Sequence, residues 1–156
     1  MPKTLETLSL QDAKRMLAAG EAKAEQIGIP YNIAVVDAGG HLLAFSRQDG
    51  ALIGSIDLAI HKAFTARACD ISTGDLAELA QPGKPLYGIQ ASNDGKIIIF
   101  GGGLPIRQKG VVIGAIGASA GTVEQDIAVA EAGVVAIEPL TQSASAALLK
   151  KQEAYK

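Results

Sequence analysis

The sequence predicts an α/β protein of the α+β kind, in which helices pack on an antiparallel sheet. Three observations support this fold class. Runs rich in β-formers come in pairs joined by tight turns, segments with a helical period separate those pairs, and no strand–helix–strand crossover is evident. The expected order is a helix, two strands, two helices, three strands and a helix. With 156 residues, 48% of them hydrophobic, the chain is long enough to form one domain with a core.

The first helix and the first hairpin have clear local signals. Residues 9–12 resemble a capping box, which predicts a helix that runs to about Ile27. Gly28 and Pro30 then stop it. The β-rich residues 32–37 and 41–48 flank Gly39-Gly40, a pair typical of a hairpin turn. We therefore expect two antiparallel strands after the first helix.

Two helices and a loop region follow the first hairpin. Apolar residues recur at intervals of three and four between Ser55 and Cys69, which predicts a helix there. Residues 72–80 are expected to form a shorter helix. Residues 81–94 contain two prolines and two glycines and are predicted as loop, with a short strand possible at Tyr87–Ala91.

The last part of the sheet is predicted from three apolar runs. Residues 97–100, 104–107 and 111–119 are expected as strands, with a hairpin turn at residues 108–110. A second capping-box pattern at residues 122–125 predicts a final helix to about Ile137, closed by Pro139. Residues 1–140 then form one domain, and residues 141–156 form either a loose tail or a further helix.

Composition excludes several classes of function. The net charge is −2 and there is no basic run, so a nucleic-acid partner is not expected. No apolar run approaches the roughly 20 residues of a membrane span, and the N-terminus lacks the apolar region of a signal peptide. One cysteine allows no internal disulfide. We expect a cytoplasmic protein without membrane or nucleic-acid partners.

The triple glycine at Gly101, Gly102 and Gly103 is the most unusual local feature. The glycines lead into Leu104 and Pro105 and not into a helix N-terminus, which argues against a phosphate-binding loop. Glycine also permits positive φ and close backbone approach. A bulge, a place where a flat ligand or a neighbouring subunit meets bare backbone, and a simple chain reversal all remain open.

Three blocks of this sequence, in order, resemble the GlcG/HbpS family of haem-binding or haem-degrading-type proteins. They are "VVDAGGHLLAFSRQDGA…SIDLAIHKAFTA", "QPGKPLYGIQASNDGKIIIFGGGLPI" and "VIGAIGASAGTVEQDIAVAEAG". Within the family the blocks look most like the C-terminal domain of PduO-type corrinoid adenosyltransferases. The resemblance spans roughly residues 8–138. It implies a profilin-like fold with a five-stranded antiparallel sheet, assembly into homo-oligomers, and a haem or small-molecule ligand.

Haem ligation in PduO-type relatives is attributed to a first-helix histidine, which this chain lacks. Its two histidines are His41, at the hairpin turn, and His61, one turn after Asp57 on the second helix. An Asp–His pair on a helix surface is one reading of His61, and a ligand or general base is the other. Met16 and Cys69 are further possible ligands, although a lone methionine at helical spacing is usually core and a lone cysteine is usually inert.

Lys62 is the strongest candidate for ligand contact. It lies seven residues after Ser55 on one helix stripe, and small residues beside it leave a recess in which it could meet a carboxylate. A solvated lysine is the alternative reading. Because a helical lysine contributes below about 1 kcal/mol to stability through solvated pairs, Lys62→Met is expected to fold. If Lys62 receives the carboxylate of a ligand, the change should weaken ligand binding, and if Lys62 is solvated, the affinity should barely change. The family motif matches this chain at Lys62 and at three expected ligand-binding residues, Asp49, Ser55 and Thr65.

Arg47 and Asp49 follow the second strand, where they are expected to pair with each other or to form the rim of the pocket. Glu124 and Asp126 fall in the first turn of the last helix, where acidic groups complement the helix dipole. They could also bind a metal or act as a general base.

Two main classes of function follow, and a third reading is a non-catalytic oligomeric partner attached to a diol- or glycolate-type pathway. The first is a haem or small-molecule binding protein with a pocket near the glycine turn and a subunit interface, which Gly101, Gly102, Gly103 and Pro105 would line. The second is a cofactor-free hydrolase, deaminase or isomerase acting on a small carboxylated catabolic intermediate. In that enzyme Lys62, with Arg47, would hold the carboxylate, and Glu124 or His61 would move protons.

Overall fold

The chain folds as an α+β domain around one antiparallel sheet. The computed structural model describes the backbone of residues 1–153 and the side chains of residues 1–138. Four strands pair in the order β2-β1-β4-β3. Their bounds are β1 Asn32–Asp37, β2 Leu42–Arg47, β3 Gly103–Gln108 and β4 Val111–Ser119. The helices are α1 Leu10–Ile27, α2 Gly54–Ala68, α3 Thr73–Leu79 and α4 Val123–Glu153, with single 3-10 turns at Ile89–Ala91 and Asn93–Gly95.

The sheet has four strands and not five, so the strand predicted at residues 97–100 is wrong. This stretch is β-rich, but its backbone forms hydrogen bonds with the Thr65 side chain and not with a neighbouring strand. The Ile98 amide donates to Thr65 Oγ1 at 3.0 Å, and the Thr65 hydroxyl donates to the Lys96 carbonyl at 3.2 Å. The segment therefore runs along α2 as irregular chain. The short strand considered at Tyr87–Ala91 is also absent, because residues 89–91 form a 3-10 turn.

The local signals for helix ends and tight turns are confirmed. Ser9 and Asp12 form a reciprocal capping box at the start of α1, and Gly28 ends that helix with φ 82°. Thr122 and Gln125 form the same kind of box before α4, with Thr122 N donating to Gln125 Oε1 at 2.9 Å. Between β3 and β4 the two turn residues, 109 and 110, both have positive φ, as a two-residue hairpin turn requires.

The last helix is longer than the sequence predicts. Its backbone continues through Pro139 to Glu153, so the expectation that this proline closes the helix is wrong. A proline inside a helix removes one backbone hydrogen bond and bends the helix, but it does not always end it. Residues 141–153 therefore prolong α4, while residues 154–156 lie outside the described residues.

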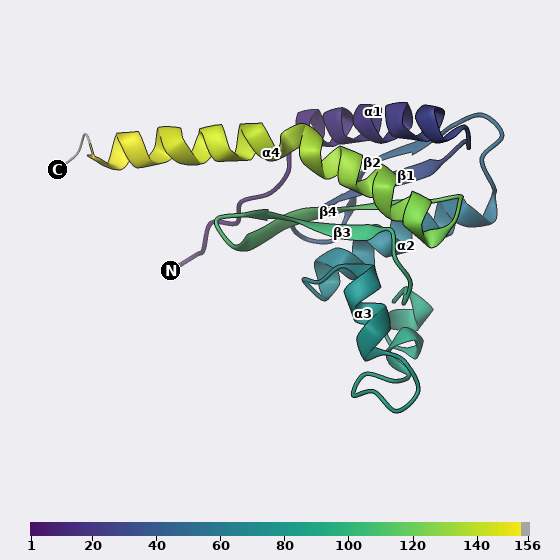
Figure 1. Ribbon diagram of the computed structural model, residues 1–156. Coiled ribbons are helices and arrows are strands. Elements are labelled where there is room, and N and C mark those ends of the chain that lie inside the picture. Colours follow the sequence, from purple (N-terminus) through teal and green to yellow (C-terminus); the bar gives the residue numbers. More distant parts are fainter. Residues whose placement is uncertain (154–156) are drawn as a thin grey trace.

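The two faces of the sheet carry different cores. Helices α1 and α4 lie side by side on one face, and α2 covers the other (Figure 1). The larger core fills the α1/α4 side with residues such as Met16, Ile33, Ile116 and Val129. On the α2 side the core is almost all alanine, including Ala34, Ala59, Ala63, Ala66 and Ala115.

The α2 face packs closely because small side chains allow the helix backbone to approach the sheet. A Cβ added at Gly117 on β4 would overlap the Ala59 carbonyl and the Ala63 amide. This approach places the next buried residue of α2, Lys62, directly over the end of the sheet. The sequence, with 4% aromatic residues and 18 glycines, suits this close packing.

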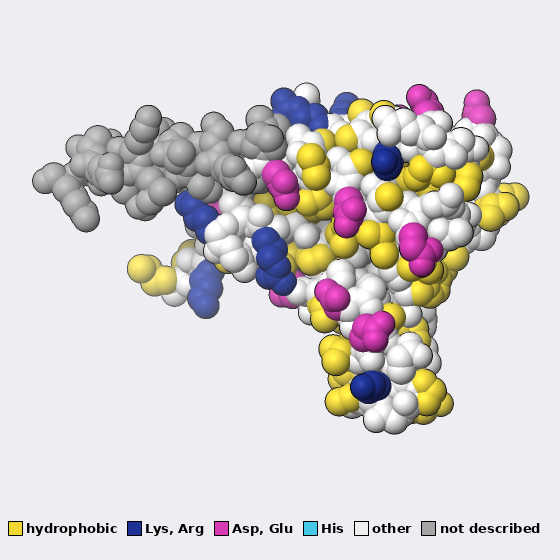
Figure 2. All heavy atoms as spheres, viewed as in Figure 1, with side chains coloured by type: hydrophobic (Ala, Val, Ile, Leu, Met, Phe, Trp, Pro, Cys, Tyr) yellow, Lys and Arg dark blue, Asp and Glu magenta, His cyan; other side chains and the backbone are white. Residues whose placement is uncertain are grey.

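Helix α3 and the loops after it stand out from the body below α2 (Figure 1). Hydrophobic side chains are visible on this projection in the space-filling view (Figure 2). Leu79, Leu86 and Tyr87 are among the exposed large hydrophobic residues there. None of the described helices combines the length and the apolar character needed to cross a membrane.

Candidate functional site

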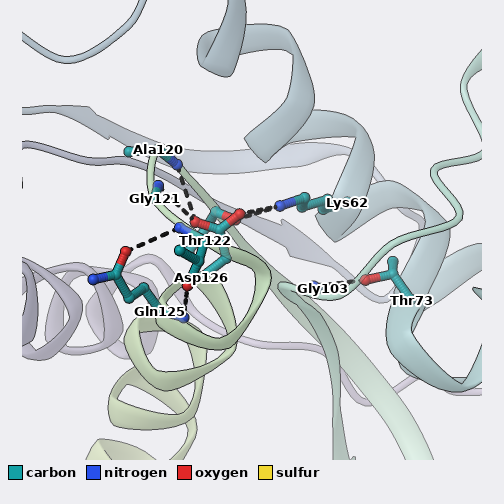
Figure 3. Close-up of polar contacts among 9 residues, drawn as sticks. Lys62, Thr73, Gly103, Ala120, Gly121, Thr122, Gln125 and Asp126 are labelled. Atoms are coloured by element: carbon teal, nitrogen blue, oxygen red, sulfur yellow. Dashed lines mark hydrogen bonds and ion pairs between the residues drawn. The ribbon is translucent and has the colours of Figure 1, made fainter.

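A buried ion pair lies where α2, the end of β4 and the start of α4 meet. Lys62 Nζ is 2.6 Å from Asp126 Oδ2 and donates a further hydrogen bond to the Ala118 carbonyl at 3.0 Å (Figure 3). The Lys62 side chain is 0% exposed and that of Asp126 is 5% exposed. The solvated lysine considered from the sequence is therefore excluded. Lys62 does meet a carboxylate in a recess, and that carboxylate belongs to the chain itself.

Asp126 is held by the backbone independently of Lys62. Its second oxygen, Oδ1, accepts hydrogen bonds from the Ala120 and Gly121 amides at 3.1 Å each (Figure 3). These amides precede α4, whose N-terminal dipole also favours a negative charge. The carboxylate is thus fixed in place by three donors, of which only one is a side chain.

The environment of Lys62 acts in two directions on its amine. Burial lowers the pKa of Lys62 below its ordinary value of 10.5, and the hydrogen bond and charge of Asp126 partly oppose this change. The ring of Phe100 also lies over Nζ, 4.8 Å from the ring centroid, which favours the ammonium form. A lysine amine in such a place is available as a neutral base or nucleophile at lower pH than a solvated one.

The triple glycine closes this site from the sheet side. A Cβ on Gly102, whose φ is 119°, would come within 2.7 Å of the Ala118 carbonyl and 2.8 Å of Lys62 Nζ. A Cβ on Gly101 would come within 2.7 Å of Ile127, and one on Gly103 would overlap the Lys62 carbonyl. Bare backbone is therefore required because α2 and α4 of the same chain lie against it.

Two threonines anchor the segment that contains these glycines. Thr73 Oγ1 accepts from the Gly103 amide at 2.9 Å (Figure 3), and Thr65 holds residues 96–98 as described above. The expected ligand residue Thr65 thus positions a loop. Ser55 is buried at the start of α2, and Pro105 lies half-buried on the edge strand β3, where the missing amide is tolerated.

Tyr31 is a buried polar residue near Asp126 that sequence reasoning missed. Its hydroxyl lies beside the Asp126 carboxylate and the Gly121 backbone without a well-formed hydrogen bond, and Oδ1 of the adjacent Asn32 has no hydrogen-bond partner among the described residues. Burial, together with the nearby Asp126 carboxylate, raises the pKa of Tyr31 well above its ordinary value of 10.0. A tyrosine placed directly before a β-rich run gives no sign of this proximity, because the contact arises only when α4 docks.

The remaining acidic and basic candidates lie elsewhere. Glu124 is exposed, although it shares the first turn of α4 with the buried Asp126. Arg47 and Asp49 are both exposed, and no ion pair joins them among the side chains that the structure describes. Asp49 instead lines an open cleft of about 250 Å³ at the C-terminal end of α1, together with Glu25, Pro30 and Gln48.

His61 lies next to Lys62 in sequence but has a different environment. Its Nδ1 is 3.2 Å from Asp57 Oδ2, and its side chain is 22% exposed. The pairing leaves Nε2 of the imidazole without a partner among the described residues. Nearly all metal-binding histidines donate their second ring N–H to a carboxylate, a carbonyl or water, so this arrangement suits ligation through Nε2.

The other possible haem ligands fit less well. His41 is exposed at the β1–β2 turn, and Met16 is fully buried in the α1 core. Burial, with a smaller contribution from Asp70, raises the pKa of the Cys69 thiol, which disfavours the thiolate that binds iron. Among the described residues, no group of three His, Cys, Asp or Glu side chains forms a metal site.

Comparison with known proteins decides the family. The model of the family described as "Haem degrading protein HbpS-like" matches residues 8–135. This chain belongs to the HbpS-like family. The resemblance inferred from its sequence blocks is thereby confirmed.

Individual relatives cover most of the chain. An uncharacterized 15.0 kDa protein of Citrobacter freundii, from the dhaT-dhaS intergenic region, is 47% identical over 125 residues, which are 80% of this chain and 88% of that protein. The corrinoid adenosyltransferase PduO of the same organism is 38% identical over 86% of this chain. Only 40% of PduO is covered, so the similarity concerns one part of that enzyme.

A solved structure connects the fold to haem. The crystal structure of a PduOC–haem complex superposes with a TM-score of 0.82 at 37% identity, covering 85% of this chain and 96% of that one. That relative binds haem. This chain therefore shares its fold with a relative whose structure contains haem.

Proposed function

We propose that this HbpS-like chain binds haem and that His61 is an axial ligand of its iron. Three observations support the proposal: the family, the likeness to the PduOC–haem complex, and the Asp57–His61 pair that leaves one imidazole nitrogen available. The last of these carries it for this chain, because α1 contains no histidine. When bound, haem supplies an iron centre for redox or ligand chemistry.

The surface around His61 suits a flat apolar ligand. Leu58 and Phe64 lie three residues before and after His61, on the same side of α2, and both are partly exposed. Leu52 and Ile53, just before the helix, are 62% and 78% exposed. An imidazole flanked by apolar side chains offers both parts of a haem site, an iron ligand and a surface for the macrocycle.

Titration with haemin tests the proposal. The wild-type protein is expected to give a saturable Soret band at one haem per chain or per symmetric pair of chains. His61→Ala should weaken binding at least tenfold or shift the band, whereas His41→Ala should change neither, because His41 is exposed at a turn. Equal effects of both substitutions, or none, would remove His61 from the site.

A second candidate function, a cofactor-free enzyme acting on a small carbonyl or carboxyl compound, is favoured by the Lys62–Asp126 pair. In the sequence-based version of this hypothesis Glu124 or His61 would move protons beside Lys62. In the structure Asp126 is the acid–base group next to the amine, while Glu124 is exposed and His61 pairs with Asp57. The activity of such an enzyme is a proposal. The pocket near the glycine turn and the assembly of several chains are also proposed.

A further inference from the structure

The amine of Lys62 is close to solvent although it is fully buried. Phe100 lies over it at 4.8 Å and is itself 37% exposed, so this ring separates the amine from solvent on that side. The ring belongs to a segment of residues 98–102, which we name the Phe100 strap. A buried lysine covered by a single partly exposed side chain differs from one enclosed by several layers of core.

The backbone of the Phe100 strap is hydrogen-bonded at its two ends. The Ile98 amide donates to Thr65 Oγ1 at 3.0 Å, and the Gly102 carbonyl accepts from the Ala118 amide at 2.9 Å. Between these anchors, no backbone hydrogen bond is made by residues 99–101 to any residue that the structure describes. Segments without backbone hydrogen bonds open at lower free energy than strands or helices do. Because Gly101 and Gly102 pack closely against α4, the end of β4 and Lys62, opening of the site requires movement of Ile99 and Phe100 between the two anchors.

We propose that Lys62 is a nucleophilic amine that forms a reversible imine with small aldehydes or ketones admitted under the Phe100 strap. The proposal gives the chemistry of the second candidate function and does not depend on haem. It uses a buried, nucleophilic group that haem binding by His61 leaves without a role.

The Lys62–Asp126 pair supplies the acid–base chemistry that imine formation needs. The 2.6 Å hydrogen bond lets a proton pass from the ammonium to Asp126 Oδ2, which leaves a neutral amine with a lone pair. The amine attacks the carbonyl carbon, a C–N bond forms, and the carbonyl oxygen takes the proton from Asp126. Asp126 then carries a second proton from the nitrogen to the hydroxyl group of the carbinolamine, the C–O bond breaks, water leaves, and a protonated imine remains beside the carboxylate. Two of the three ammonium protons leave in the water molecule, and the net charge of the site is unchanged.

The product fits the site for an electrostatic reason. The protonated imine carries its positive charge at the same nitrogen, so Asp126 and the Phe100 ring stabilise it as they stabilise the ammonium. Burial, which lowers the pKa of Lys62, favours release of the proton that blocks the lone pair. The Ala118 carbonyl, 3.0 Å from Nζ, keeps the nitrogen oriented toward the pair.

Borohydride trapping tests the proposal. The haem-free protein is incubated at pH 7.5 with acetaldehyde or benzaldehyde and sodium cyanoborohydride, and the adducts are located by peptide mass spectrometry. Lys62 should be alkylated at least tenfold faster than the exposed Lys14 and Lys84, because the Asp126 carboxylate 2.6 Å from its amine takes up the proton that blocks the lone pair. Modification of Lys62 no faster than that of these surface lysines would overturn the proposal.

Two variants separate the roles of the amine and the strap. Lys62→Arg keeps the charge, and its peptide should carry no adduct, so an adduct that persists there would contradict the assignment. Phe100→Ala should raise the trapping rate at Lys62 several-fold if the strap limits access. Labelling that occurs only in Phe100→Ala would show that the native strap does not admit carbonyl compounds, and this also would overturn the proposal. Because no haem is present, none of these results bears on ligation by His61.

Discussion

Replacement of Lys62 by methionine provides the sharpest test of the buried ion pair. Methionine has a similar length and a similar helix propensity, so the change chiefly removes the charge. Asp126, 3% exposed, keeps the Ala120 and Gly121 amides at Oδ1 but loses the Lys62 ammonium at Oδ2. Removing one member of a buried pair typically costs about 3–5 kcal/mol. Since two of the three donors remain, we expect the low end of that range, about 3 kcal/mol.

Urea unfolding followed by far-UV circular dichroism measures this loss, because the chain has no tryptophan to report by fluorescence. Lys14→Met, on the exposed side of α1, is the matched control and should change the stability by less than about 0.5 kcal/mol. In the double variant Lys62→Met/Asp126→Asn the amide oxygen still accepts from both backbone amides, so we expect it to recover about 2 kcal/mol relative to the sum of the single changes. A loss below about 1 kcal/mol for Lys62→Met would contradict the buried ion pair, because only a solvated lysine contributes so little to the free energy of unfolding.

Three further predictions follow from the packing. Gly102→Ala should lower the free energy of unfolding by about 2 kcal/mol or more, because the new Cβ would meet Lys62 Nζ and the Ala118 carbonyl. The control Gly83→Ala, which has positive φ but open space around it, should lose only about 1 kcal/mol in the same unfolding assay. Tyr31→Phe should change the stability by less than about 1 kcal/mol at pH 7, because the hydroxyl makes no well-formed hydrogen bond to the residues that the structure describes. Because the pKa of Tyr31 is raised in the folded state, the contribution of Tyr31 to the free energy of unfolding is complete below pH 10.0 and is lost as the pH rises above it. Tyr31→Phe should therefore unfold less readily than the wild type in alkaline titrations. Identical alkaline curves would contradict the burial of this phenol. Size exclusion with light scattering should show an assembly larger than the 16.0 kDa monomer, and a clean monomer would contradict self-association.

The sequence predicts the parts of this fold that depend on neighbouring residues. Capping boxes and glycine pairs act within a few residues, so the ends of α1, the start of α4 and both hairpin turns could be located in advance. Residues 97–100 could not, because their β-rich composition is overridden by the hydroxyl of Thr65, more than 30 positions earlier.

The site shows the same division between local and long-range information. Lys62 could be singled out from its small neighbours, but its partner could not be chosen between Glu124 and Asp126. These two residues differ by about 200° around the helix, and only the docking of α4 decides which one faces inward. In the structure Asp126 shares its side of the helix with Val129 and Ala130, which are fully buried. Glu124 has Ile127 and Ala128 at the same spacing, so the apolar pattern alone does not choose between the two acidic residues.

The most direct test of haem binding through His61 is chemical rescue of the ligand. His61→Gly leaves a space where the imidazole was, and free imidazole can occupy that space and bind the iron. If His61 binds the iron, haemin added to His61→Gly gives a weak, shifted Soret band. Millimolar imidazole then restores the position and the saturation of the wild-type band. If His61→Gly binds haemin as the wild type does before imidazole is added, His61 is not an axial ligand of the haem iron.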